Sequence, residues 1–198
     1  MSADAIWITW ENQTRNHSMS TKLGVPLYEL ISPNTGIRRY LELMWRTFQL
    51  IRKHRPSVVF CQNPSIVLAF FCTFLFQTKH RKVVVDEHNA GLFPLEGKSA
   101  ALNFLANYVV RHADLLIVSN ENLSQHCERI GGKAVVIPDP LPDLTNYEQA
   151  ADPAPPFQIL FICGWGDDEP VEAVFEACKS LFPGEFKVVT TMSLHPSN

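Results

Sequence analysis

The chain has 198 residues, of which 46% are apolar and 19% are charged, and it carries 13 Phe and 4 Trp. This composition is ordinary for a globular protein and excludes a disordered chain. The formal net charge of −3 gives no general attraction to nucleic acid, so we expect no nucleic-acid partner.

Apolar runs alternate with helical patterns along most of the chain. We predict strands at 5–10, 26–31, 57–61, 82–86, 114–118 and 134–138, and helices at 14–23, 37–54, 65–77, 99–112 and 121–130. Gly24 is expected to end the first helix, and Asn120 is placed to cap the last one. Strands that alternate with helices of this length indicate βαβ units. The expected fold is therefore α/β, with a Rossmann-like parallel sheet and flanking helices.

Prolines interrupt this pattern between residues 142 and 156. We predict a first domain at 1–143, a Pro-rich linker at 144–156 and a second segment at 157–198. That segment reads as a strand at 157–163, a helix at 168–181 and a strand at 186–190. One βαβ unit of this size rarely folds alone, so we expect the truncated start of a second Rossmann-like domain.

The sequence gives few signs of membrane insertion. Its most apolar stretch, Ile66 to Phe76, is much shorter than the roughly 20 residues that span a bilayer, and no signal peptide is evident. Five cysteines without a C-x-x-C pair argue against a zinc ribbon or disulfide scaffold and are typical of a reducing compartment. We expect a cytoplasmic protein, with peripheral contact to a membrane surface through the basic runs at 38–55 and 79–82 as an alternative to a solvated face.

Polar side chains follow four of the predicted strands. In an open parallel sheet, ligands bind outside the carboxyl ends of the strands, so these side chains converge on one edge. His88 follows Asp86 and Glu87 directly and is the candidate catalytic residue, because a histidine there can bind a substrate hydroxyl or relay a proton. The alternative is an exposed loop histidine, and Asp86 has the alternative of capping backbone amides.

Other candidate residues flank the same edge or open the second segment. Glu11, Arg15 and Asn16 lead into a helix whose N-terminus suits a phosphate, although a polar loop explains them equally well. Further substrate-binding candidates are Asp86, Asn89 and Glu121, together with Asn63 and Asn120. Asn63 has the simpler alternative of a turn residue, and Asn120 that of a helix cap. Gly164 and Gly166 permit close approach to a donor phosphate, or form a tight turn.

Several enzyme classes lack their motifs here. No Gly-x-Gly-x-x-Gly follows a strand, which counts against a dehydrogenase, and no Gly-x-Ser-x-Gly elbow or His-Glu-x-x-His motif is present. We therefore propose no metal site and expect no cofactor.

Taken together, the motifs resemble the N-terminal half of GT-B fold glycosyltransferases of the family-4-like group. The matching pieces, in chain order, are Trp10-Glu11 with Arg15-Asn16, Gln62-Asn63-Pro64, Val85-Asp86-Glu87-His88-Asn89, Val118-Ser119-Asn120-Glu121 with Leu123, Pro138-Asp139-Pro140-Leu141-Pro142, Leu160 to Gly164, Asp168-Glu169-Pro170 and Val171-Glu172-Ala173. The resemblance implies two Rossmann-like domains facing a cleft, with the acceptor on the N-terminal domain and the nucleotide-sugar donor on the C-terminal one. It also implies that His88 touches the transferred sugar.

Two departures from the family pattern are visible. The first loop, 11–14, lacks the glycines of many relatives, and the family's donor-binding glutamates and their basic partner would lie beyond Asn198. We therefore expect a glycosyltransferase, or a fragment of one, that is inactive as this chain alone. It would move a sugar from a nucleotide-sugar donor to a lipid-linked or saccharide acceptor. The alternatives are a non-catalytic acceptor-binding subunit that needs a partner chain, and a sugar-nucleotide epimerase.

Overall fold

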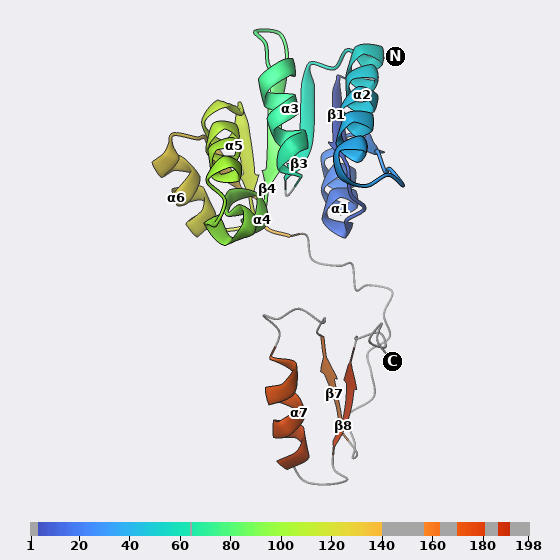
Figure 1. Ribbon diagram of the computed structural model, residues 1–198, viewed down its shortest axis with the longest axis vertical. Coiled ribbons are helices and arrows are strands. Elements are labelled where there is room, and N and C mark those ends of the chain that lie inside the picture. Colours follow the sequence, from blue (N-terminus) through green and yellow to red (C-terminus); the bar gives the residue numbers. More distant parts are fainter. Residues whose placement is uncertain (1–3, 64, 140–156, 163–169, 181–185, 191–198) are drawn as a thin grey trace. The chain divides into compact units, whose positions relative to one another are not determined.

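The computed structural model describes residues 4–63, 65–139, 157–162, 170–180 and 186–190. The chain divides into two compact units, Met1–Pro142 and Asp143–Asn198, which are described separately below (Figure 1). The expected linker at 144–156 lies outside the described residues.

The first unit contains a six-stranded sheet in the order β2-β1-β3-β4-β5-β6. All of its strand pairs are parallel. The strands are β1 (Ala5–Thr9), β2 (Leu27–Glu29), β3 (Val58–Asn63), β4 (Lys82–Glu87), β5 (Leu115–Val118) and β6 (Ala134–Val136). The predicted α/β class with a Rossmann-like parallel sheet is confirmed.

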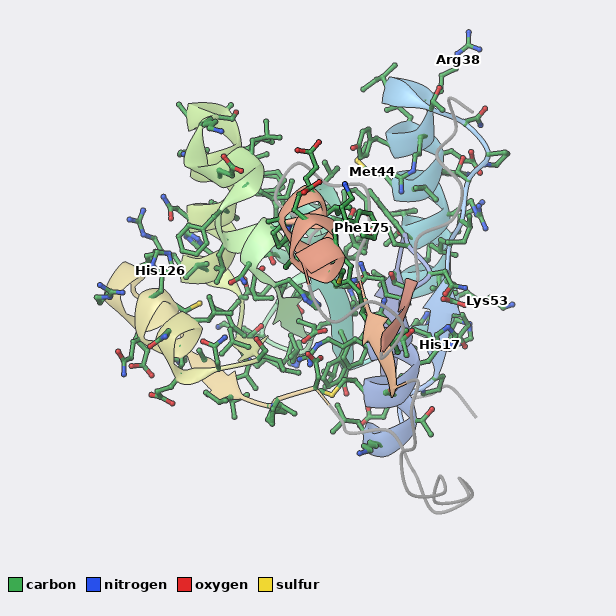
Figure 2. All side chains as sticks on the ribbon, turned by 90° about the horizontal axis from the view of Figure 1, so that it is seen from below. His17, Arg38, Met44, Lys53, His126 and Phe175 are labelled. Atoms are coloured by element: carbon green, nitrogen blue, oxygen red, sulfur yellow. The ribbon has the colours of Figure 1, made fainter. Side chains whose placement is uncertain are left out.

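Helices cover both faces of this sheet. They are α1 (Thr14–Leu23), α2 (Gly36–His54), α3 (Ile66–Phe76), α4 (Asn89–Leu92), α5 (Ala100–His112) and α6 (Glu121–Ile130), with a 3-10 turn η1 (Pro94–Gly97). Connections between parallel strands are right-handed. In the strand order, the chain moves from β1 to β2 in one direction and from β2 onward in the other. The connecting helix α1 therefore lies on the opposite face of the sheet from the later helices. Figure 2 shows α1 and α2 on opposite sides of the sheet.

The alternation of side chains along each strand splits the core into two parts. Ile6, Ile8, Val59 and Leu43 belong to the larger part, which α2, α3, α5 and α6 cover. On the other face, Trp7 packs in a smaller cluster with Met19 of α1 and stacks on Phe60 at 5.2 Å. Both faces of the sheet are therefore packed, which fixes the strand ends that carry the polar residues.

Two expected helix ends are confirmed. Gly24 ends α1 in the left-handed conformation, where a residue without a Cβ is least strained. The Asn120 side chain accepts a hydrogen bond from the Leu123 amide at 3.1 Å and so caps α6.

At two places next to the carboxyl edge of the sheet, the structure differs from the expected elements. Strand β3 extends through Gln62 and Asn63, which we expected in a turn, because these residues continue the ladder opposite Asp86 and Glu87 of β4. The short helix α4, which starts directly after His88, was not expected, since four residues carry too little periodicity to be recognised.

The second unit contains one βαβ element within its described residues. Strand β7 (Phe157–Phe161) pairs in parallel with β8 (Phe186–Thr190), and α7 (Val171–Ser180) lies between them in the sequence. The expected strand at 157–163 ends at Phe161 instead. Across the described parts of both units, no helix is long and apolar enough to cross a bilayer.

Candidate functional site

The carboxyl ends of the strands in the first unit bring polar side chains from distant parts of the sequence together. The period-two alternation assigns them to two faces of the sheet. Thr9, Gln62 and Asp86 lie on the face that α1 covers, whereas Asn63 and Glu87 lie on the other. Each set forms hydrogen bonds of its own, so the edge has two polar clusters rather than one.

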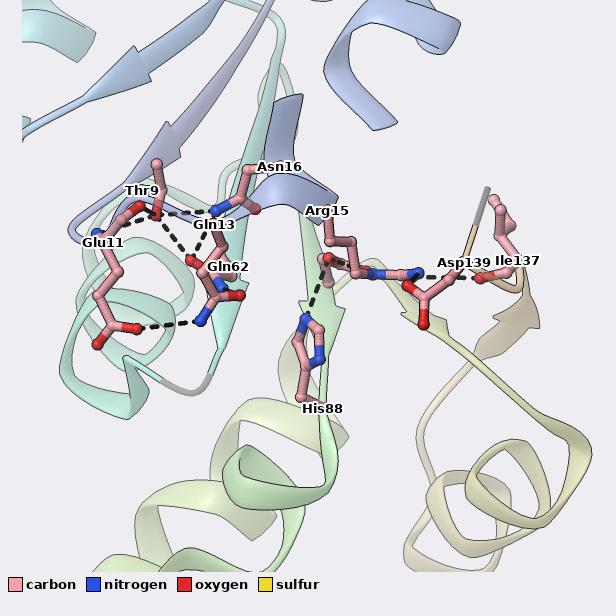
Figure 3. A network of polar contacts seen from close by, with 10 residues as sticks. Thr9, Glu11, Gln13, Arg15, Asn16, Gln62, His88, Ile137 and Asp139 are labelled. Carbon is pink, nitrogen blue, oxygen red and sulfur yellow. Dashed lines mark hydrogen bonds and ion pairs between the residues drawn. The ribbon is translucent and has the colours of Figure 1, made fainter. Parts of the chain in front are cut away.

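Arg15, in the first turn of α1, binds the carboxylate of Asp86 at the end of β4 (Figure 3). Its Nη2 lies 2.8 Å from Asp86 Oδ1, and its Nε lies 3.0 Å from Oδ2. Both side chains are buried, with exposed fractions of 7% and 0%. A planar guanidinium matches a carboxylate with two parallel hydrogen bonds, so this pair fixes the start of α1 against the sheet.

The same guanidinium also reaches the segment that follows β6. Its Nη1 pairs with the exposed carboxylate of Asp139, and its Nη2 donates to the carbonyl of Ile137 at 3.2 Å. Burial tends to lower the pKa of Arg15, but the hydrogen bonds and charges of Asp86 and Asp139 outweigh it and raise the pKa. Arg15 is therefore a permanent cation that joins β4 to the end of β6.

His88 lies beside this ion pair, at the N-terminal boundary of α4. Its Nε2 is 3.5 Å from Asp86 Oδ2, and its side chain is 31% exposed. Burial alone would raise the pKa of Asp86, but its contacts with His88 and Arg15 lower the pKa below the ordinary value. With its proton on Nε2, the ring faces this carboxylate and leaves Nδ1 to accept from a ligand hydroxyl.

A second network lies on the same face, closer to β1. The Thr9 hydroxyl donates to Gln62 Oε1 at 2.7 Å, and the Asn16 amide donates to the same oxygen at 2.9 Å. Gln62 in turn donates to Gln13, whose own amide donates to Glu11 at 3.2 Å. Because Gln62 and Asn16 are fully buried, this network orients the loop after β1 and brings the half-buried Glu11 to its outer end.

On the opposite face, Asn63 and Glu87 form a buried pair. The Asn63 amide donates to Glu87 Oε1 at 3.0 Å, and both residues are almost completely buried. Burial raises the pKa of Glu87 to about 8, with a smaller contribution from the charge of Asp86. Gly91 of α4 packs directly against the pair, since an added Cβ would lie 2.5 Å from both side chains. The cluster is thus built around a carboxyl group that is neutral at physiological pH.

The remaining candidates lie apart from these clusters. Asn89 is exposed in the first turn of α4, and Asn120 and Glu121 are exposed at the start of α6. Gly164 and Gly166 lie outside the described residues. Asn16 and Asn63 are buried, and their side chains donate hydrogen bonds to protein groups. Among the candidates within the two clusters, His88 and Glu11 are more exposed to solvent. The roles of all these residues in binding stay predictions.

Three contributors to the site were missed from the sequence. Gln62 reads as a turn residue before Pro64, but it is the centre of a network, and Thr9 binds it. Gln62 and Thr9 continue the alternation of side chains along their strands, and this pattern could have indicated that they share one face of the sheet. No local pattern links Asp139 to Arg15. No group of three or more His, Cys, Asp or Glu side chains that would hold a metal ion occurs within the described ranges.

The sequence matches the family model of the glycosyl transferase 4-like domain over residues 4–140. The chain belongs to this family. The match covers the whole described sheet of the first unit and both polar clusters, and it confirms the resemblance to family-4-like glycosyltransferases. A search of curated protein sequences finds no match.

Solved structures share the fold of this family member at low sequence identity. Over 98% of the chain, it is similar to MnaA from S. aureus in complex with UDP, with a TM-score of 0.62 and 14% identity. It is also similar to a protein from Listeria monocytogenes described as a UDP-N-acetylglucosamine 2-epimerase (98% of the chain, TM-score 0.58, 12% identity) and to the UDP-GlcNAc 2-epimerase of Methanocaldococcus jannaschii (97%, 0.56, 14%). The chain spans 63%, 64% and 65% of the lengths of these three proteins, respectively.

Proposed function

We propose that this chain provides the acceptor side of a glycosyltransferase, with His88 at the reacting sugar. The donor is a nucleotide sugar, and the acceptor is a lipid-linked or saccharide hydroxyl. The observation that carries the proposal is the family match over residues 4–140, which includes the buried Arg15–Asp86 pair and the neighbouring His88. The likeness to a protein solved with UDP supports a nucleotide-sugar donor.

The geometry suits a reaction that depends on positioning. In sugar transfer, the bond from the anomeric carbon to the diphosphate breaks, a bond to the acceptor oxygen forms, and that oxygen loses its proton. His88 Nε2 lies 3.5 Å from Asp86 Oδ2, so a proton on Nε2 leaves Nδ1 as the hydrogen-bond acceptor of the ring for a sugar hydroxyl. Arg15 keeps Asp86 ionised and in place. Binding of this kind lowers the barrier by fixing the reactants.

The proposal is tested by transfer of radiolabelled sugar. The purified chain is incubated with a panel of nucleotide sugars, and label is measured in a lipid extract and in soluble saccharides. The chain alone is expected to be inactive, so any label that it does transfer should enter one acceptor class and should fall by about a hundredfold or more in His88→Ala. His112→Ala is the matched control, because His112 is exposed at the C-terminal end of α5, away from the carboxyl edge. A His88→Ala variant that transfers at the wild-type rate refutes the role of His88.

The same assay distinguishes the non-catalytic alternative. A chain that transfers nothing, but binds an acceptor saccharide in a manner that His88→Ala weakens, is an acceptor-binding subunit that needs a partner for the donor site. Transfer by the isolated chain would contradict the expectation that this chain alone is inactive. It would also exclude the hypothesis of a non-catalytic acceptor-binding subunit.

A second candidate is a sugar-nucleotide epimerase, which the likeness to two UDP-N-acetylglucosamine 2-epimerase structures favours. Its test omits the acceptor. The chain is incubated with UDP-N-acetylglucosamine, and the proton NMR spectrum is followed for signals of the 2-epimer. Their appearance supports the epimerase, and an unchanged spectrum beside successful sugar transfer excludes it.

A further inference from the structure

Two hollows that share Phe48 adjoin α2 and α3, on the helix layer that covers the larger core, and together they form the α2–α3 groove. Its first part has a volume of about 330 Å³ and is lined only by apolar side chains, namely Leu41, Met44, Trp45, Phe48, Phe71 and Leu75. Several of them are exposed for such large apolar residues: Trp45 by 60%, Leu41 by 58% and Leu75 by 51%. An exposed apolar surface of this kind marks an interaction site.

The second part of the groove is basic. It has a volume of about 350 Å³ and is lined by Phe48, Ile51, Arg52, Arg55, Phe76 and Arg81. Phe48 lines both parts, and its ring stacks on Trp45 at 5.8 Å and contacts Phe76 at 6.1 Å. Three guanidinium groups therefore lie at one end of an aromatic groove whose lining has no carboxylate.

The arginines are not paired with acids. Arg81 donates from Nε to the Pro56 carbonyl at 3.1 Å and lies over the Phe76 ring, and no described carboxylate forms an ion pair with Arg52, Arg55 or Arg81. By contrast, Arg46 on the same helix pairs with Glu42. The unpaired guanidinium groups are available to an external anion.

Arg55 occupies a backbone position that would suit glycine. It ends α2 with φ 48° and ψ 48°, in the left-handed region. Gly24 and Gly131 hold the equivalent positions at the ends of α1 and α6, where a residue without a Cβ is least strained. The guanidinium of Arg55 is therefore placed at the groove despite a less favourable backbone conformation.

We infer that this α2–α3 groove docks the chain on a membrane surface that contains anionic phospholipid. Acyl chains make no hydrogen bonds, so they suit the wholly apolar part, whereas a bound peptide would bury its backbone groups there without partners. Lipid phosphates suit the three guanidinium groups. Phe48 lies between the two environments, and Trp45 stacks on it from the apolar part. Tryptophan is a residue that membrane interfaces favour. Met44 is in the lining of the apolar part, and Figure 2 shows that Met44 and Arg38 point in different directions from α2.

The groove is distinct from the candidate active site. Arg52 and Arg55 lie at the C-terminal end of α2, and Arg81 lies directly before the first residue of β4, whereas His88 follows the last residue of that strand. Docking there leaves the carboxyl edge unoccupied. The inference does not depend on the proposed sugar transfer.

The experiment is co-sedimentation of the purified chain with vesicles of phosphatidylcholine alone and of an equimolar mixture with phosphatidylglycerol. We expect binding to the mixed vesicles only, and weaker binding as salt is added. Each basic residue near an anionic surface strengthens binding about fivefold, so Arg52→Ala with Arg55→Gly is expected to bind roughly thirtyfold more weakly. Trp45→Ser is expected to lose binding as well.

The variants separate docking from folding. Arg55→Gly favours the left-handed backbone, so this variant should melt at or above the wild-type temperature while it binds less. Arg111→Ala with Arg129→Ala removes the same charge from exposed positions on α5 and α6 and should bind like the wild type. The inference is overturned if the wild type does not bind the mixed vesicles. It is also overturned if the Arg52→Ala/Arg55→Gly variant and the Arg111→Ala/Arg129→Ala variant bind equally well. A wild-type dimer that Trp45→Ser dissociates, without vesicle binding, would instead make the groove a protein interface.

Discussion

Arg15 and Asp86 are 71 residues apart in the sequence, yet they form a buried ion pair with two parallel hydrogen bonds at the carboxyl edge of the sheet. Arg15 lies in the first turn of α1, and Asp86 is the penultimate residue of β4, so the pair connects the first helix to the middle of the sheet. His88 contacts the same carboxylate. The candidate catalytic histidine thus lies against a buried structural pair.

Asp86→Asn is expected to destabilise the fold by about 3–5 kcal/mol, because it leaves the buried Arg15 without its main counter-charge. Urea unfolding followed by circular dichroism measures the loss. The control is Lys82→Ala, which breaks an ion pair with Asp114 at a largely exposed position and should cost less than about 1 kcal/mol. An equal loss of unfolding free energy in the two variants would show that the buried pair stabilises the fold no more than the exposed pair does.

Glu87 makes the stability of the fold depend on pH. Its folded-state pKa of about 8 lies above the ordinary 4.5, so between these values the folded protein keeps a proton that the unfolded chain releases. Stability from this residue is present below about pH 4.5 and is lost as the pH rises to about 8. Glu87→Gln keeps a neutral polar group, so its advantage over the wild type should grow by roughly 3 kcal/mol from pH 5 to pH 8. Denaturant titrations at the two pH values test this, and a constant difference contradicts it.

Gly91→Ala should destabilise the fold, because the added methyl group would overlap both Asn63 and Glu87. Such overpacking costs about 1–3 kcal/mol. Gly97→Ala is a useful comparison: its φ of 77° strains an alanine, but the space around it is open. Thermal unfolding should show the larger loss for Gly91→Ala, together with a changed pH dependence, since the Glu87 environment is altered. An unchanged pH dependence would mean that Gly91 does not shape this environment.

Asn120 caps α6 and is also a predicted substrate contact, and two substitutions separate these roles. Asn120→Ala should cost about 1 kcal/mol of stability, whereas Asn120→Ser should restore most of it, because serine is also a good N-cap. Asn122→Ala, at an exposed position in the first turn of the same helix, should have little effect. If Asn120 binds a ligand through its amide, the serine variant will be stable but will bind more weakly. Full binding by this variant would leave only the capping role.

Much of the fold could be predicted from the sequence because its signals are local. Apolar periodicity identified the main strands and helices, and Gly24 and Asn120 marked helix ends through their own backbone and side-chain chemistry. The convergence on one edge followed from the parallel sheet alone, because the carboxyl ends of parallel strands meet there.

The contacts within the site could not be predicted in the same way, because they depend on strand order. The sequence placed Arg15 in a loop that suits a phosphate, but it did not show that the sheet order and the helix connections bring Arg15 to Asp86 and Asp139. Gln62 was interpreted as a turn residue because Pro64 follows it, and only its pairing with Asp86 in the ladder shows that the strand continues.

The Arg15–Asp86 pair also limits how this sequence can change over generations. Replacing either residue alone leaves a buried charge without its partner, so a lineage must change both together or keep both. Arg15 further contacts Asp139 and the Ile137 carbonyl, so even a neutral double replacement would release the segment after β6. An exposed position such as Arg38 carries no such constraint. Substitutions should therefore accumulate much faster at Arg38 than at Arg15, although the two arginines lie on consecutive helices of the chain.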